Sequence, residues 1–132
     1  MRLALFLMAA SVALAEPPAD VLKFFRSAAE ALADGDSRAF LGKFDRATPG
    51  YAALRDEIEG LLAGHEVGST IEIVNDEGDN QRRTLQLDWL LSITDLGLRR
   101  QIVKCKIERR GKEWKITALD PIEFFTATEA RQ

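Results

Sequence analysis

The hydrophobic pattern of the chain has two periods, one in each half. In the first half, apolar residues recur every three or four positions, which predicts helices with one buried face over residues 21–32, 40–44 and 51–62. Gly35 follows the first of these runs, and glycine readily adopts the left-handed conformation that ends a helix. Thr48 precedes a proline, a pattern typical of a helix cap and first turn. The first half is therefore expected to form three helices.

In the second half, apolar and polar residues alternate, which predicts strands over 70–73, 83–93, 99–108 and 114–118. Residues 75–80 have turn composition and predict the first hairpin tip. One face of this sheet is apolar, formed by Ile71, Ile73, Leu85, Leu87, Trp89, Leu91, Val103, Cys105, Ile107, Trp114 and Ile116. Because that face needs a cover, we expect an α+β fold in which the three N-terminal helices pack on a curved four-stranded antiparallel sheet.

Two segments resemble the nuclear transport factor 2-like superfamily, whose fold is also described as cystatin-like. One is 25–36, where a helix ends at an Asp-Gly-Asp sequence before a short second helix, and the other is the terminal hairpin 111–116. The resemblance covers nearly all of residues 16–132 and implies a single domain, with the sheet wrapped around helices and a conical pocket inside. Some members are ketosteroid isomerases or polyketide cyclases, many only bind, and many pair through their sheets, so the fold alone selects no function.

Residues 1–15 have the order of a secretory signal peptide. Arg2 precedes an apolar run over 3–14, which ends in the small-x-small site Ala13-Leu14-Ala15. The run is shorter than the roughly 20 apolar residues that a membrane-spanning helix needs. We expect cleavage after Ala15 and export to the periplasm or the medium. The mature chain, 16–132, should then carry no membrane anchor.

Charge and cysteine content argue against several classes of chemistry. The formal net charge is −3 at pH 7, which gives no electrostatic reason to expect a nucleic-acid partner. Cys105 is the only cysteine, so no internal disulfide is possible, and its apolar neighbours predict burial. Asp76, Glu77 and Asp79 are expected at a solvated hairpin tip rather than in a calcium loop. With a single histidine and no phosphate loop or nucleophile elbow, we expect no metal site, no cofactor and no catalytic residue.

The candidate pocket is the interior of the cone. Its expected lining consists of Phe40, Phe44, Asp45, Tyr51, Leu87, Trp89, Cys105 and Trp114. Asp45 and Tyr51 could offer an acceptor and a donor at the pocket mouth, or serve only as a turn residue and a packing residue. Enzymes of the resembled superfamily use a carboxylate inside the cone, whereas strand parity places Asp88 on the outer face. A bulge at 89–91 would turn Asp88 inward.

The outer sheet face is the second candidate site. It mixes apolar and polar side chains, and we expect a homodimer through Gln86, Asp88, Leu90, Ile102 and Lys104. A basic patch is predicted on the same face from Arg100, Lys104, Lys106 and Lys115. The sequence as a whole favours an exported non-enzymatic domain that binds a small apolar ligand or a protein partner. A cone-pocket isomerase or cyclase and a structural dimeric module of the envelope are the alternatives.

Overall fold

The computed structural model describes residues 17–127, so the predicted signal peptide lies outside the described residues. The helices are α2 (Ala19–Ala33), α3 (Ser37–Leu41) and α4 (Tyr51–Gly64). They are followed by β1 (Val67–Gly78), β2 (Arg82–Ile93), β3 (Gly97–Arg110), β4 (Glu113–Asp120) and the 3-10 helix η1 (Ile122–Phe125). The strands form one antiparallel sheet in the order β1-β2-β3-β4. Three helices followed by a four-stranded meander confirm the predicted α+β fold.

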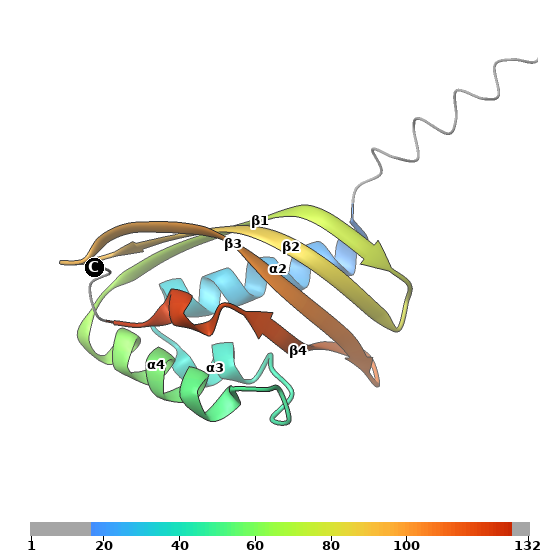
Figure 1. Cartoon of the computed structure of the whole chain (residues 1–132), viewed down its shortest axis with the longest axis horizontal. Helices are drawn as coiled ribbons and strands as arrows, with labels where there is room; N and C mark the ends of the chain where they lie inside the picture. The colour runs from blue at the N-terminus through green and yellow to red at the C-terminus, as the bar shows by residue number, and fades with distance from the viewer. Residues whose placement is uncertain (1–16, 128–132) are drawn as a thin grey trace, which may run out of the picture.

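The sheet curves around the first long helix. In Figure 1, β1, β2 and β3 arch over α2, while α3 and α4 lie on the side of α2 away from these strands. α2 packs chiefly against β1, and α4 packs against η1. Within residues 17–127, no helix has the length and apolar character needed to cross a membrane.

Local sequence signals account for the ends of α2 and α3. α2 has Asp20 in its first turn, where a carboxylate interacts favourably with the helix dipole. It ends at Ala33, and Gly35 then follows the C-cap with a positive φ of 71° that a side chain would disfavour. The side chain of Asp36 then accepts a hydrogen bond of 2.9 Å from the backbone N–H of Ala39 and caps α3. The stop at Gly35 is the one that the sequence predicts.

Thr48 does not cap α4, contrary to the sequence prediction. The N-cap is Gly50, and the buried hydroxyl of Thr48 instead donates to the carbonyl oxygen of Ile116 across 2.9 Å. Phe44 also forms a parallel bridge with Ile116. The loop between α3 and α4 is therefore fastened to β4, where the carbonyl oxygen of Ile116 also accepts a hydrogen bond of 2.9 Å from the backbone N–H of Asp45.

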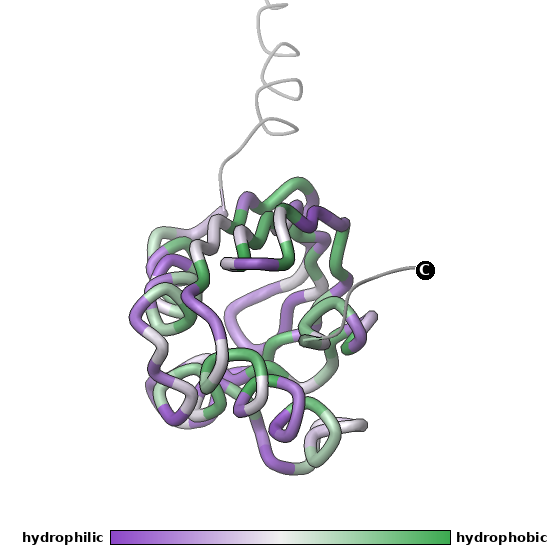
Figure 2. Tube along the Cα trace, turned by 90° about the vertical axis from the view of Figure 1, so that its left-hand side faces the viewer, coloured by the Kyte–Doolittle hydropathy of each residue, from purple (hydrophilic) through white to green (hydrophobic). Residues whose placement is uncertain are grey.

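The alternation of β2 is as predicted. Its inward-facing residues are buried, and they are Leu85, Leu87, Trp89, Leu91 and Ile93. The register between β2 and β3 is unbroken from Leu87 to Leu91, so no bulge turns Asp88 inward. In Figure 2, hydrophobic and hydrophilic positions alternate along the trace of the sheet. The inner face is apolar along β2 because strict period-two alternation survives there.

β1 extends beyond its predicted end and carries a carboxylate inward. The segment predicted as a turn is part of the strand up to Gly78, and a bulge between Ile73 and Asn75 shifts the parity. The side chain of Asp76 is therefore only 9% exposed, and its Oδ1 lies 2.8 Å from Nε of Arg83. The expected solvated tip is confined to residues 79–81, where Asp79 accepts two backbone N–H groups.

Aromatic rings fill the interior of the curved sheet. Phe40 and Trp89 meet with ring centroids 6.2 Å apart, and Phe125 lies 5.7 Å from Phe40 and 5.2 Å from Trp89. Phe124 adds a fourth ring, 5.2 Å from Phe125. These edge-to-face contacts are a favourable arrangement for aromatic pairs. The short apolar segment at the end of the chain therefore completes the core.

Candidate functional site

Six of the eight predicted pocket residues lie in the closed core. Each is at most 5% exposed: Phe40, Phe44, Leu87, Trp89, Cys105 and Trp114. The structure does bring these side chains together, but around packed rings. Burial raises the pKa of the Cys105 thiol well above its usual range, so the group stays protonated at neutral pH.

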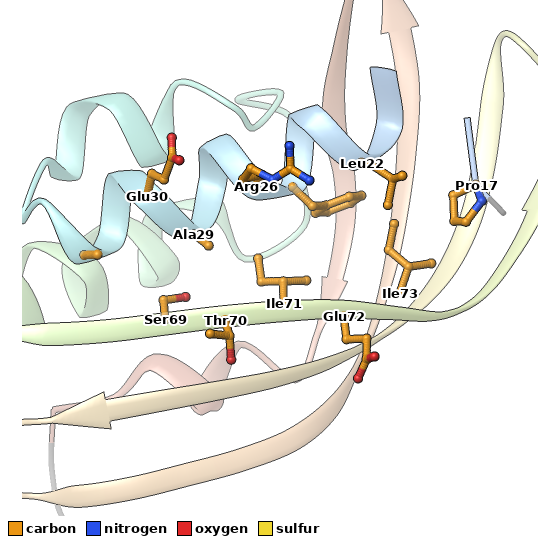
Figure 3. A pocket seen from close by; sticks show the side chains of 12 residues that line it. Pro17, Leu22, Arg26, Ala29, Glu30, Ser69, Thr70, Ile71, Glu72 and Ile73 are labelled. Carbon is orange, nitrogen blue, oxygen red and sulfur yellow. The ribbon is translucent and has the colours of Figure 1, made fainter. Parts of the chain in front are cut away.

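An open apolar groove lies between α2 and the edge strand β1. It has a volume of about 430 Å³, and its lining is Pro17, Leu22, Phe25, Arg26, Ala29, Glu30, Ala33, Ser69, Thr70, Ile71, Glu72 and Ile73. Figure 3 shows Leu22 and Ala29 of α2 facing Ile71 and Ile73 of β1 across this space. Ile71 and Ile73 were predicted on the inner sheet face, and they remain only half-buried. Apolar area is therefore left open along the groove.

Polar groups are few and lie at defined places along the groove. Ser69 Oγ accepts a hydrogen bond of 3.0 Å from the indole N–H of Trp89, so its own proton can be donated to a ligand. Arg26 and Glu30 are exposed on α2 at the rim. This arrangement suits a mostly apolar molecule with one acceptor group.

A second depression lies between α3, α4 and β4, with a volume of about 790 Å³. It brings together Phe44, Asp45 and Tyr51, three of the residues predicted for the pocket. Asp45 Oδ2 accepts a hydrogen bond of 2.8 Å from Arg110. The backbone N–H of Ala47 and the Arg110 guanidinium hold the pKa of Asp45 below its ordinary value. Asp45 thus stays ionised and orients Arg110, a role unsuited to a general base.

The predicted dimer residues lie on adjacent strands of the outer face. Gln86 pairs in register with Lys104, and Asp88 with Ile102. Asp88 also binds the Arg100 guanidinium of its own chain through two hydrogen bonds of 3.0 and 2.7 Å. That contact holds the pKa of Asp88 below its ordinary value. The predicted basic patch is therefore weaker than the sequence suggests.

Lys115 must be removed from that patch. Its Nζ donates to the backbone carbonyl of Gly42 at the β4 edge, and the side chain lines the second depression. Sequence parity alone could not show this, because the long side chain reaches around the edge of the sheet. Of the predicted patch, Arg100, Lys104 and Lys106 remain as exposed side chains of β3.

Two further placements bear on the chemistry of the sites. Asp76 is an inward carboxylate that the sequence analysis missed, because the bulge that turns it inward leaves no clear pattern. It is absent from the lining of the described groove. Between residues 17 and 127, no three His, Cys, Asp or Glu side chains are placed so that they could hold a metal ion.

No protein-family model matches the chain, and no curated protein matches it in sequence. Solved structures are similar in fold. Bd1075 from Bdellovibrio bacteriovorus has a TM-score of 0.68 and 14% identity, covering 76% of this chain and 39% of that protein. An NTF-2 like protein of unknown function from Shewanella oneidensis MR-1 has a TM-score of 0.61 and 15% identity, covering 76% and 93%. A protein of unknown function with a cystatin-like fold from Nostoc punctiforme PCC 73102 has a TM-score of 0.57 and 16% identity, covering 81% and 96%.

These likenesses and the observed architecture define the class of structure. The chain has the nuclear transport factor 2-like, or cystatin-like, α+β fold. The chain spans well under half of Bd1075, and identities of this size establish the fold alone.

Proposed function

We propose that the protein is an exported, non-catalytic domain that binds a small apolar ligand in the groove between α2 and β1. The groove itself carries the proposal, because its walls are apolar and its volume is about 430 Å³. Ligand sites usually measure about 300–1,000 Å³ and are mostly apolar with a few placed polar groups. Ser69 supplies one such group.

The free energy of binding would come from apolar burial. Ile71 and Ile73 are half-buried in the free protein. Leu22, which lies opposite them, is half-buried as well. Each Å² of apolar surface that a ligand covers contributes about 25 cal/mol. A neutral, elongated molecule fits this lining better than a charged one, since Arg26 and Glu30 at the rim carry opposite charges.

The placement of the carboxylates supports binding over catalysis. The isomerase or cyclase alternative needs a carboxylate that reaches the ligand from a water-poor site. Glu30 and Glu72 contribute to the groove lining but are exposed to solvent. Asp76 faces inward, but its charge is paired with Arg83.

A protein partner is the second candidate for the same place. β1 is the edge strand next to the groove, and an extended segment could add to that edge with alternate side chains directed into the groove. Such a partner would cover Ile71 and Ile73 as a small ligand does. The two occupants differ in mass, and the experiments below separate them.

The experiment is a fluorescence titration of the mature protein with Nile red, a neutral apolar probe. We expect saturable binding of Nile red to the wild type. In Ala29→Phe, whose ring would occupy the groove, the affinity should fall at least about tenfold, which corresponds to roughly 1.4 kcal/mol of binding free energy. Ala53→Phe is the matched control, since it places the same ring on the exposed face of α4. Should Ala29→Phe fail to fold, Leu22→Ser removes apolar wall instead. Equal binding by the groove variant and the control would contradict the proposal.

We also propose that the outer sheet face forms a homodimer. Ile102 is 47% exposed, and half-buried Leu90 lies one strand away. Across a two-fold axis, Lys104 and Lys106 of β3 would approach Glu72 of β1 in the other copy. Apolar contact near the axis and opposite charges around it support a self-complementary face.

A further inference from the structure

The depression between α3, α4 and β4 gathers positive charge on an acidic protein. Its basic lining residues are Arg38, Arg46, Arg55, Arg110 and Lys115. Only Asp45 and Glu59 oppose them there, although the whole chain has a net charge of −3. An adjoining depression shares Gly42 and Lys115 and adds Lys23, Lys43 and Lys112, against Asp20 and Glu113. The positive potential is therefore local, and the net charge conceals it.

Three of the guanidinium groups are available to a ligand. Arg110 is already bound to Asp45 and Glu108, at 2.8 Å in each case. Across the part of the chain that the structure describes, Arg38 and Arg46 make no ion pair, and Arg55 only approaches Asp56 at 3.5 Å on an exposed surface. Exposed pairs of that kind contribute little, so Arg55 is readily redirected.

The floor of the depression is apolar and aromatic. Leu41 and Phe44 are buried there, and Tyr51 is half-buried at the start of α4. A flat apolar body could stack against Tyr51 while the exposed arginines surround its charged end. The depression thus combines a basic rim with an apolar floor, and an inorganic anion would use only the rim.

Positive charges are crowded in this region, which favours the binding of an anion. Burial, and the nearby ammonium group of Lys115, lower the pKa of Lys43 below its ordinary value. Lys43 lies 5.6 Å from the ring centroid of Phe24, which partly offsets its cost. A bound anion would relieve the repulsion among these cations.

We propose that this depression binds an organic anion, an aromatic body carrying a phosphate, sulfate or carboxylate group. The ring lies on Leu41, Phe44 and Tyr51, and the anionic group lies among Arg38, Arg46 and Arg55. Guanidinium groups suit this task because their planar donors match the oxygen atoms of such anions. The site is separate from the groove between α2 and β1 and stands independently of the function proposed for that groove.

The test is a titration of the mature protein with phenyl phosphate, followed by amide NMR shifts. We expect saturable shifts within residues 37–59, with an affinity that falls at least about threefold when ionic strength rises from about 0.02 to about 0.5 M. Phenol and inorganic phosphate, each carrying half of the ligand, should bind at least about tenfold more weakly. No saturable shift below about 10 mM, or equal binding of phenol, would overturn the proposal.

A charge-matched pair of variants separates the site from net charge. Arg38→Glu/Arg46→Glu should lower the affinity for phenyl phosphate at least about tenfold. Asn80→Glu/Gln81→Glu/Arg82→Glu changes net charge equally at exposed positions of the first hairpin, and its affinity should stay within about twofold. If the first variant loses its dispersed spectrum, Arg38→Gln/Arg46→Gln replaces it. Equal losses in both variants would show a long-range charge effect and no site.

Discussion

The indole N–H of Trp114, in β4, donates a hydrogen bond of 3.1 Å to Oδ2 of Asp20, in the first turn of α2. The same carboxylate oxygen accepts a hydrogen bond of 3.0 Å from Arg109, whose guanidinium lies 4.2 Å from the centroid of the Trp114 ring. Three residues from the two ends of the domain thus form one cluster. It ties the start of the first helix to the terminal hairpin.

Replacing Trp114 by alanine should strongly destabilise the fold. The side chain is buried, and its removal leaves a cavity as well as losing apolar contact. We expect a loss of about 3–5 kcal/mol in the free energy of unfolding, measured by urea denaturation. Trp114→Phe keeps most of the buried surface, and Asp20 still accepts a hydrogen bond from Arg109 in that variant. The free energy of unfolding of Trp114→Phe should therefore fall much less than that of the alanine variant. An alanine variant with an unchanged denaturation midpoint would show that this ring is not part of the core.

The charge of Asp20 should contribute stability at neutral pH and none in strong acid. The Arg109 guanidinium, and to a smaller extent the indole N–H of Trp114, hold the pKa of Asp20 below its ordinary value. A lowered folded-state pKa gives stability that is present above the unfolded value of about 4 and is lost as the pH falls through the folded value.

Asp20→Asn removes the charge while keeping an acceptor. Because Asp20 is half-exposed, the loss at pH 7 should not exceed about 1 kcal/mol. Urea denaturation of both proteins should give curves that converge as the pH drops toward about 2. A difference that persists unchanged in acid would assign the effect to something other than the carboxylate charge.

Export predicts a defined N-terminus for the mature protein. The apolar run ending at Ala13-Leu14-Ala15 should be removed by signal peptidase, so N-terminal sequencing of exported material should begin at Glu16. Protein recovered outside the cytoplasm with Met1 intact would contradict the prediction.

The proposed homodimer can be tested by placing a single charge on the outer sheet face. Ile102→Glu places a carboxylate beside its own copy across a two-fold axis, so it should convert the dimer to a monomer while leaving unfolding cooperative. Analytical ultracentrifugation at micromolar concentration measures this directly. Ala53→Glu, on exposed α4, should remain dimeric. A wild-type protein that sediments as a monomer would contradict the proposed homodimer.

The order of elements and the parity of β2 were predictable because both follow from periodicity. Leu87 and Trp89 are buried and Asp88 faces outward, as alternation requires. The inward turn of Asp76 was not predictable, because a single extra residue at Val74 reverses parity inside a segment of turn-like composition.

The sites themselves were only partly predictable. The sequence shows that Leu22, Ile71 and Ile73 are apolar, but the groove exists because β1 is an edge strand, with no further strand beside it within residues 17–127, and α2 does not fill the space next to it. The basic depression collects side chains from α3, the following loop, α4 and the terminal hairpin. Such gatherings depend on tertiary structure, and no local pattern in the sequence marks them.

The most direct test of the groove as a binding site is native mass spectrometry of the protein purified from its own envelope. The wild type should carry an additional small mass that organic solvent releases, and Ala29→Phe should lose it while Ala53→Phe retains it. A partner protein would appear instead as a much larger added mass. A wild type of bare mass, or an adduct that Ala29→Phe retains in full, would contradict the proposal that the groove between α2 and β1 binds a small apolar ligand.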